Sequence, residues 1–280
     1  MYSRAYVEIT NICNKNCSFC HGHKRPLRQM KEEEFSHILT QLKGQTEYIY
    51  YHLMGEPLTH PKLPGLIRMA TDQGFRSVLT TNGSLLKDRG GELLDAKPHK
   101  IHISLHSFEQ GTREDHLAYL EQIAAFMDLA AETNTIVSLR LWNKDVDDGK
   151  NDETLSFLKS RLAGDWTPNT RGYRIRDKQF LEWGDRFAWP DMEAPVQSEI
   201  ASCYGLRDQF GILVDGTVVP CCLDSDGIID LGNVFREDLK DILSSPRATA
   251  IAEGFRCRKA TEELCRRCGY ATRFQKEKGK

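Results

Sequence analysis

The sequence predicts an α/β fold in which a partial barrel of six strand–helix units is followed by a small cysteine-rich domain. Strand-like and helix-like segments alternate over the first two thirds of the chain, and polar motifs follow several of the strand-like segments. Six of the nine cysteines lie after residue 200. We therefore expect the barrel to span residues 1–190 and the small domain residues 191–280.

The strand-like segments are short and rich in β-branched and aromatic residues, and they are residues 2–10, 48–53, 75–81, 100–106, 135–142 and 173–176. The helical segments repeat apolar residues at intervals of three and four, and they are residues 31–42, 63–73, 85–94, 114–132 and 153–162. Because repeated βα units give parallel strands and right-handed crossovers, this order predicts a parallel sheet. Six units form an open TIM-type barrel, with its chemistry at the carboxyl ends of the strands.

Composition sets broad limits on the function. A chain of 280 residues can form one large α/β domain with a small appendage. A net charge of −2 with 28% charged residues gives no electrostatic reason to expect a nucleic-acid or membrane partner. Nine cysteines without a recognisable signal peptide or long apolar segment favour a reducing compartment and metal-bound thiolates, so we expect a cytoplasmic protein.

Three cysteines follow the first strand-like segment at a distinctive spacing. Cys13, Cys17 and Cys20 stand on one short loop, with the aromatic Phe19 directly before the last of them. Three thiolates can ligate three irons of a 4Fe-4S cluster and leave the fourth iron open to a cofactor. The residues alone leave one alternative, a zinc site completed by a nearby histidine. The spacing and the aromatic resemble the signature loop of the radical S-adenosylmethionine (SAM) enzymes.

This resemblance implies that SAM chelates the open iron and that one electron from the cluster cleaves SAM to a deoxyadenosyl radical. The Met54-Gly-Glu-Pro57 stretch resembles the family's Gly-Gly-Glu-Pro loop, with Met in place of the first Gly. The implied SAM-binding residues lie on the cysteine loop and at strand ends, and they are Phe19, Gly55, Glu56, Thr80, Asn82, Ser104, His106 and Arg140. Ordinary alternatives are a plain turn at Asn82-Gly83 and an ion pair between strands for Arg140.

The later cysteines resemble the C-terminal extension of the SPASM and twitch radical SAM proteins. The match includes a hairpin-like segment at residues 210–220 and the pair Cys265-Arg-Arg-Cys268. The twitch form carries one auxiliary 4Fe-4S cluster, and the pattern most resembles that of the aminoglycoside-pathway inosamine dehydrogenase. This implies Cys203, Cys221, Cys265 and Cys268 as ligands, with Cys222 as an alternative to Cys221. We expect Cys257, at a helix end, to be a buried small residue.

Substrate-binding candidates are polar and aromatic residues near the barrel mouth, and they are His52, His102, Trp142, Asn143, Arg174, Arg176 and Glu182. For His52 and His102 a place as ordinary core histidines stays open. The aromatic-rich residues 178–190 are typical of a lid or a bridge between domains. No residue is identified as a catalytic acid or base.

Many SPASM enzymes carry an N-terminal leader-peptide-binding domain, whereas the barrel pattern here begins at residue 2, so we expect no such domain. This favours a small-molecule substrate. We expect a lyase that abstracts hydrogen from a small polar, ring-containing compound and cleaves a C–N or C–C bond, as in queuine lyase, which the compact chain resembles. The alternatives are a twitch-type oxidoreductase acting on an alcohol or sugar, and a ribosomal-peptide maturase. The expected protein partner is a flavodoxin- or ferredoxin-type reductant.

Overall fold

The computed structural model describes residues 1–146 and 149–275, of which the last two are described by backbone alone. Contacts divide the chain into two compact units. Unit 1 comprises Met1–Ile12, His21–Gly55 and Phe187–Lys280, and unit 2 comprises Cys13–Cys20 and Glu56–Arg186. This grouping does not test the predicted domain boundary at residue 190, which stays a prediction.

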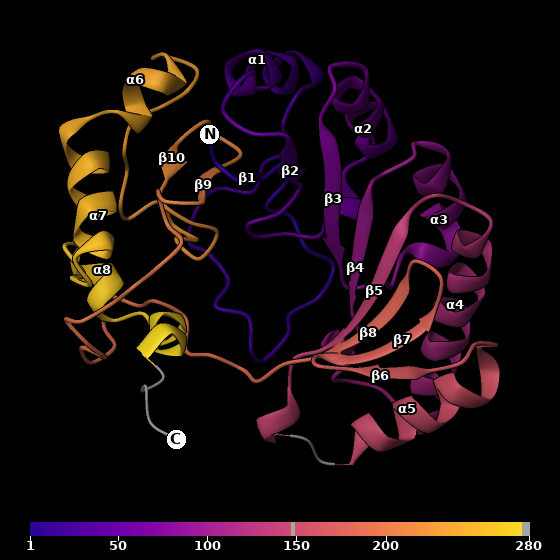
Figure 1. Ribbon diagram of the computed structural model, residues 1–280. Coiled ribbons are helices and arrows are strands. Elements are labelled where there is room, and N and C mark those ends of the chain that lie inside the picture. The colour runs from indigo at the N-terminus through magenta and orange to yellow at the C-terminus, as the bar shows by residue number, and fades with distance from the viewer. Residues whose placement is uncertain (147–148, 276–280) are drawn as a thin grey trace. The chain divides into compact units, whose positions relative to one another are not determined.

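Unit 2 is built on parallel strands. They are β3 (Arg76–Thr81), β4 (Lys100–Ser104), β5 (Ile136–Leu141) and β8 (Gln179–Trp183), paired in that order. The helices of this unit are α2 (Leu63–Asp72), α3 (Leu86–Asp95), α4 (Arg113–Ala131) and α5 (Lys150–Arg161). Short 3-10 turns are η1 (Pro57–Thr59), η2 (Leu105–Ser107) and η3 (Lys144–Val146). Figure 1 shows α2, α3 and α4 along one side of these strands.

The last parallel strand of unit 2 is not the predicted one. Residues 173–176 do form a strand, β7 (Gly172–Arg176), but it runs antiparallel between β8 and the short β6 (Thr167–Asn169). The parallel partner of β5 is β8, inside the segment predicted to be a lid or bridge. The prediction was wrong because a hairpin places two short strands where the βα pattern suggests one.

Unit 1 places the first strand between two parallel neighbours. β1 (Arg4–Val7) pairs with β2 (Tyr48–Tyr50) on one side and with β9 (Gln209–Ile212) on the other. β10 (Val218–Val219) pairs antiparallel with β9, which confirms the predicted hairpin. The helices of this unit are α1 (Glu32–Leu42), α6 (Leu239–Leu243), α7 (Pro246–Arg256), α8 (Glu263–Arg266) and the 3-10 helix η4 (Gly269–Gln275).

Helix α4 shows how sequence and packing combine in the outer layer. Thr112 and Asp115 form a capping box at its start, in which each side chain accepts a hydrogen bond from the other's backbone amide. The helix then buries an apolar face that includes Leu120 and Ile123 against the sheet. A Cβ on Gly83 would lie 2.8 Å from Ile123 Cδ1 and 3.0 Å from Ile103 Cγ2. Ile103 of β4 therefore points to the helix layer.

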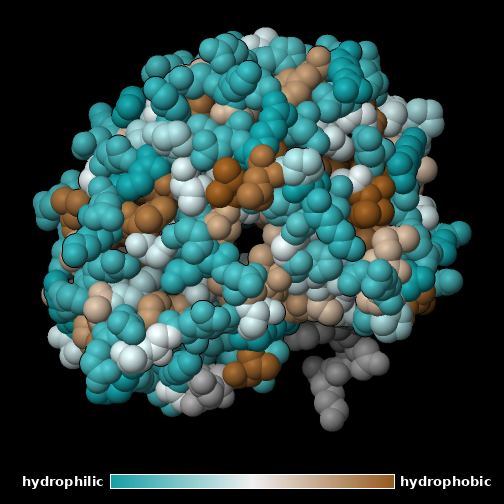
Figure 2. All heavy atoms as spheres, turned by 180° about the vertical axis from the view of Figure 1, so that it is seen from behind, coloured by the Kyte–Doolittle hydropathy of each residue, from teal (hydrophilic) through white to brown (hydrophobic). Residues whose placement is uncertain are grey.

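The described part of the chain contains no helix long and apolar enough to cross a membrane. Figure 2 shows a mostly hydrophilic face on which hydrophobic side chains form small separate groups.

Candidate active site

The loop Cys13–Cys20, called here the cluster loop, is fixed by contacts within unit 2. The Cys17 thiol lies 3.7 Å from the carbonyl oxygen of Ser107, and the Cys20 amide donates to the Cys17 carbonyl at 3.1 Å. Burial is the largest cause that raises the pKa of the Cys17 thiol to about 12. The nearby Glu109, Cys13 and Cys20 also raise it, in that order. The three thiols are thus close enough to act on one another electrostatically, and ligands of one cluster must lie on one loop or at adjoining positions in this way.

Two asparagines join the cluster loop to the end of β3. Asn14 Nδ2 donates to Ser84 Oγ at 2.8 Å, and Asn82 Nδ2 donates to Asn14 Oδ1 at 2.9 Å. The Ser84 amide donates in turn to Asn82 Oδ1 at 2.9 Å. This set of bonds places Asn82, a predicted SAM residue, beside the cluster loop. Asn14 and Ser84 were not predicted from the sequence.

Glu109 is a second contact of the cluster loop that the sequence did not indicate. Its carboxylate accepts hydrogen bonds from the Ser18 amide at 2.5 Å and from the Ser18 hydroxyl at 2.6 Å. Arg186 Nη2 lies 3.8 Å from the same carboxylate, and the guanidinium carbon lies 5.5 Å from the ring centroid of Phe19. Glu109 stands in a loop that matches no motif, so only the fold reveals it.

Glu56 connects the Met-Gly-Glu-Pro loop to the end of β3. Its buried carboxylate accepts hydrogen bonds from the Leu58 amide at 3.0 Å, the Thr81 hydroxyl at 2.6 Å and the Asn82 amide at 2.7 Å. Burial raises the pKa of this carboxyl, and the three hydrogen bonds act in the opposite direction. These bonds give Glu56 a positioning role. Its contact with the SAM amino group stays a prediction.

Gly55 occupies a position that no other residue can fill without strain. Its φ is +76°, and a Cβ there would lie 2.4 Å from the carbonyl oxygen of Thr10 and 2.9 Å from the carbonyl carbon of Asn11. The glycine therefore lets the chain after β2 pass against the segment that follows β1.

His106, Phe19 and Arg140 form one contact chain in unit 2. The rings of Phe19 and His106 have centroids 4.8 Å apart, and His106 Nδ1 lies 3.1 Å from the carbonyl oxygen of Arg140. Burial lowers the pKa of His106 to about 4, so the imidazole is neutral near pH 7. The Arg140 guanidinium carbon lies 4.6 Å from the ring centroid of Trp142. The structure thus brings three predicted SAM residues together.

The sheet face opposite the helices carries four of the remaining candidates, Thr80, His102, Ser104 and Glu182. Because side chains alternate along a strand and Ile103 faces α4, His102 and Ser104 point away from the helices. The strand register extends this face into two rows, one of Thr80, His102, Ser138 and Phe180, the other of Ser104, Arg140 and Glu182. The Thr80 and Ser138 hydroxyls are buried and have no hydrogen-bond partner among the described residues.

Other substrate candidates lie elsewhere. Arg176 Nη2 donates to Asp128 Oδ1 at 2.9 Å, near the end of α4 and so at the amino ends of the strands. Arg174 pairs with Asp177 at 3.5 Å. His52 belongs to unit 1, where its ring centroid lies 5.3 Å from that of Tyr6. Asn143 follows Trp142 after β5. The two arginines therefore do not join the other candidates.

The four predicted auxiliary-cluster cysteines gather in unit 1. Burial raises the pKa of the Cys221 thiol, and the next causes are the Cys203, Cys222, Cys265 and Cys268 thiols. The turn before Cys221 also lies close to the Cys203 loop, because a Cβ on Gly205 would be 3.1 Å from the carbonyl oxygen of Pro220. Five thiols from three segments of the chain are thus close enough to act on one another electrostatically.

Cys222 differs from Cys221 in its surroundings. Its thiol is hydrogen-bonded to the Tyr6 hydroxyl, and its side chain packs against a buried cluster of Tyr6, Leu53, Leu213 and Val219. Burial raises the pKa of Cys222 to about 11. A thiol engaged by a strand residue is less suited to ligate iron, which supports Cys221 as the ligand; the assignment stays a prediction.

The profile of the radical SAM superfamily matches residues 7–156 of the chain. The chain belongs to the radical SAM superfamily. The profile of the SPASM iron-sulfur cluster-binding domain matches residues 203–269. The chain is therefore a radical SAM enzyme with a SPASM domain.

Two curated radical SAM relatives act on nucleotides, according to their names. The GTP 3',8-cyclase of Chlorobaculum tepidum is 30% identical over 174 residues, which cover 58% of this chain and 50% of the relative. The S-adenosylmethionine-dependent nucleotide dehydratase of Selenomonas ruminantium is 27% identical over 176 residues, which cover 58% of this chain and 63% of the relative. The matched region thus spans half of the first relative's length and less than two thirds of the second's.

Solved structures share the fold along nearly the whole chain. BtrN in complex with AdoMet and 2-DOIA has a TM-score of 0.60 at 18% identity, covering 96% of this chain and 93% of BtrN. The enzyme anSMEcpe with bound AdoMet has a TM-score of 0.65 at 14% identity, covering 99% and 91%. The predicted α/β fold, a partial barrel with an auxiliary-cluster domain, is confirmed.

The cofactors of this radical SAM enzyme are SAM, the 4Fe-4S cluster that binds it, and an auxiliary cluster. The donor chemistry fits the two clusters, since the cluster loop carries three cysteines and the thiols around Cys221 in unit 1 act on one another electrostatically. Because the ligands are thiolates, cluster binding releases the protons that burial favours on these thiols.

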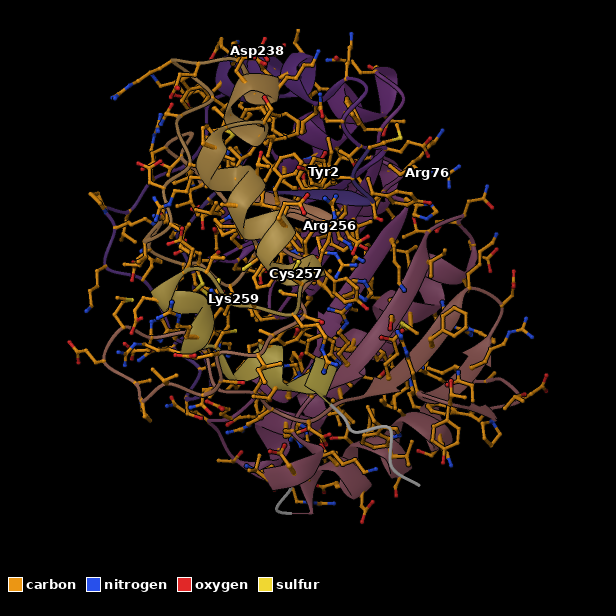
Figure 3. The ribbon with its side chains drawn as sticks, turned by 60° about the vertical axis from the view of Figure 1, so that its left-hand side comes forward. Tyr2, Arg76, Asp238, Arg256, Cys257 and Lys259 are labelled. Atoms are coloured by element: carbon orange, nitrogen blue, oxygen red, sulfur yellow. The ribbon has the colours of Figure 1, made fainter. Side chains whose placement is uncertain are left out.

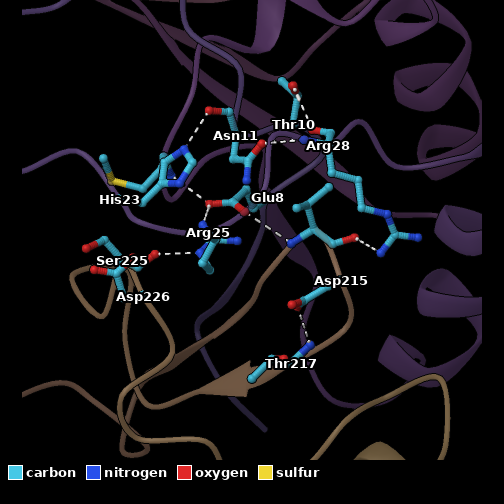
Figure 4. Close-up of polar contacts among 12 residues, drawn as sticks. Glu8, Thr10, Asn11, His23, Arg25, Arg28, Asp215, Thr217, Ser225 and Asp226 are labelled. Atoms are coloured by element: carbon cyan, nitrogen blue, oxygen red, sulfur yellow. Dashed lines mark hydrogen bonds and ion pairs between the residues drawn. The ribbon is translucent and has the colours of Figure 1, made fainter.

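A buried ion pair in unit 1, Glu8 with Arg25, connects the segments that follow β1, β2 and β9. Glu8, directly after β1, pairs with Arg25 Nη2 at 2.7 Å and accepts hydrogen bonds from the amides of Met54 and Val214, each at 3.1 Å. Arg25 Nε also donates to the carbonyl oxygen of Ser225 at 2.7 Å (Figure 4). Sequence reasoning missed this network because its members are far apart along the chain.

Cys257 corrects one expectation. It lies at the C-cap of α7, as predicted for a helix end, but its side chain is exposed rather than buried. Figure 3 shows it between Arg256 and Lys259. The buried face of α7 is formed by residues such as Ile251 and Phe255. The helix ends at Arg256, so Cys257 lies beyond this face.

Proposed function

We propose that this radical SAM enzyme abstracts a hydrogen atom from a small polar, ring-containing substrate and cleaves a C–N or C–C bond, a lyase reaction of the queuine lyase type. The observation that carries the proposal is the inner face of unit 2. It presents the Glu182 carboxylate, which accepts no hydrogen bond from the described residues, and the buried, unpartnered hydroxyls of Thr80 and Ser138. Buried polar groups of this kind require polar partners.

The names of the relatives support a ring-containing substrate. A GTP cyclase and a nucleotide dehydratase act on compounds that combine a flat heterocycle with a sugar. The inner face of unit 2 offers the matching chemistry, because it combines hydroxyls and a carboxylate with the aromatic side chain of Phe180.

When bound, SAM and its 4Fe-4S cluster supply the deoxyadenosyl radical that takes the hydrogen atom. The chain's own residues position the reactants, since a misplacement of about 1 Å lowers the rate strongly. Glu109 and Asn82 fix the cluster loop, and Glu56 fixes the end of β3. His106, neutral near pH 7, packs on Phe19 without adding charge.

We further propose a flavodoxin- or ferredoxin-type protein as the source of the electron, because the cluster must be reduced before each SAM cleavage. Binding of a reduced carrier to the holoenzyme, with oxidation of that carrier only when SAM is present, would test this partner.

A second candidate is a two-electron oxidation of an alcohol or sugar. The observation that favours it is the thiol group around Cys221, because a cluster with four cysteine ligands can take an electron but not bind substrate.

The decisive experiment uses the anaerobic holoenzyme with dithionite and SAM. We expect slow release of deoxyadenosine without substrate, and faster release with a compound from a panel of nucleobases, nucleosides, sugars and peptides. Mass spectrometry of the products distinguishes a cleaved ring compound from an oxidised alcohol. Formation of methylated products without deoxyadenosine would contradict the proposal.

A further inference from the structure

Glu182 stands at the centre of a charged group on the inner face of unit 2. Its carboxylate lies 4.0 Å from Lys100 Nζ and 3.9 Å from Arg140 Nε. The three side chains are 19%, 26% and 15% exposed, respectively. Both distances exceed those of hydrogen bonds, so the two cations flank the carboxylate without occupying its lone pairs.

One of the flanking cations, Arg140, is itself packed against an aromatic ring. Arg140 comes from the neighbouring strand at the same register as Glu182, and its guanidinium carbon lies 4.6 Å from the Trp142 ring centroid. The Trp142 ring packs against the backbone of Gly184, where a Cβ would lie 2.8 Å from Trp142 Cδ1. Both oxygens of Glu182 can thus accept hydrogen bonds while the two cations stay beside them.

The local charge indicates which donor suits this acceptor. Lys100 and Arg140 outweigh Glu182, and Arg171 lies near enough to Lys100 to act on it electrostatically. The excess positive charge disfavours an ammonium group. Neutral N–H groups do not meet this repulsion, and two of them side by side match the two carboxylate oxygens.

We propose that Glu182 is a specificity-determining residue that binds the N–H edge of a guanine-type ring, where a ring N–H and an exocyclic amine are adjacent. This rests on the proposed function, because it names the ring class of that substrate. An adenine-type ring places an acceptor nitrogen beside its amine, so it would turn one lone pair toward the carboxylate.

The test measures equilibrium binding to the anaerobic holoenzyme with SAM by titration calorimetry. The probes are 7-deazaguanine and 7-deazahypoxanthine, which lacks only the exocyclic amine. We expect wild type to prefer 7-deazaguanine by about tenfold to a hundredfold, because a bidentate contact discriminates by this factor. Glu182→Gln should reduce the preference to less than about twofold, and Glu182→Asp should keep it at lower affinity. The matched control is Glu121→Gln, on the exposed side of α4.

The outcomes separate the inference from the proposed function. If wild type binds SAM but neither ring, the ring-containing substrate itself is wrong. If wild type shows the preference and Glu182→Gln retains it with normal iron content, the assignment to Glu182 is overturned. If Glu182→Gln instead weakens SAM binding, the residue serves to orient Arg140, and the inference is also wrong.

Discussion

Glu109 illustrates how one side chain can fix a cofactor loop. It accepts two hydrogen bonds from Ser18, between the second and third cysteines of the cluster loop, and it lies in no motif. Hydrogen bonds to a charged acceptor are worth about 1.5–3 kcal/mol, enough to decide whether an exposed loop stays closed.

We expect Glu109→Gln to loosen the cluster loop without unfolding the protein. The glutamine can keep both contacts to Ser18, with Oε1 accepting from the Ser18 amide and Nε2 donating to the Ser18 hydroxyl, but the extra strength that the negative charge of the carboxylate gives to both bonds is lost. A chelator should then remove the 4Fe-4S cluster roughly tenfold faster than from wild type. The decay of the cluster's visible absorbance measures this rate. Glu121→Gln, an exposed acid paired with Arg161, serves as the control. Equal rates in both variants would rule out the positioning role.

A second residue-scale prediction separates the adjacent cysteines. Cys221→Ala should remove about four irons, because it eliminates an auxiliary ligand, whereas Cys222→Ala should keep about eight. Tyr6→Phe, which removes the hydroxyl that contacts Cys222 and Arg4, should also retain the full complement. Iron and sulfide analysis after anaerobic purification measures all three. Loss of iron in Cys222→Ala alone would exchange the two assignments.

Among the elements, the Met-Gly-Glu-Pro loop depends on a close backbone approach. Gly55 and Gly44 have the same φ of +76°, but a Cβ on Gly55 meets the Thr10 carbonyl oxygen, whereas one on Gly44 meets nothing within 4 Å. We expect Gly44→Ala to cost about 1 kcal/mol of unfolding free energy from backbone strain alone, and Gly55→Ala about 3 kcal/mol or more. Denaturant unfolding measures the difference. Equal costs would mean that the neighbouring backbone yields.

The cluster loop can also be tested as a whole element. Replacing Cys13, Cys17 and Cys20 together by Ala should remove about half of the iron, about four of eight atoms per chain. A chelator should remove the remaining iron as slowly as it removes the auxiliary-cluster iron of wild type, because the auxiliary thiols are unchanged. Retention of all the iron would show that the loop carries no cluster.

Much of the element order was predictable, because amphipathic helices and short apolar strands leave local patterns. Helix α1 and strand β3 lie within two residues of their predicted limits. The β7–β8 hairpin was not predictable in this way, since Lys178, a non-glycine residue with φ of +56°, gives no turn signal. Pairing of β9 with β1 depends on residues some 200 positions apart, which no local pattern records.

The site shows the same division. The cysteines and the Gly-Glu-Pro loop are motifs, and their spacing indicated them directly. Glu109 and Arg25 act through distant partners, so nothing nearby in the sequence marks them. Arg174 and Arg176 were expected at the barrel mouth because their strand was assumed to be parallel, whereas the antiparallel β7 directs Arg176 to Asp128.

At the scale of the whole molecule, the auxiliary cluster distinguishes the two candidate reactions. If the reaction is a redox-neutral cleavage, folded Cys265→Ala and Cys268→Ala variants should retain some product formation. If it is an oxidation, they should still release deoxyadenosine but form no product. Thermal unfolding must accompany the assay, because loss of a metal site can unfold a small domain. We expect the first outcome.

The position of β1 has a consequence for how the chain is made. β1 is translated about 200 residues before β9, which is one of its two hydrogen-bonding neighbours. Until then the edge of β1 is open to pairing with other chains. A fragment ending at residue 190 lacks β9, so this edge of β1 would stay unpaired. We therefore expect the barrel to aggregate when it is expressed without the cysteine-rich domain. Synthesis of this enzyme therefore demands that the open edge of β1 be shielded until β9 emerges.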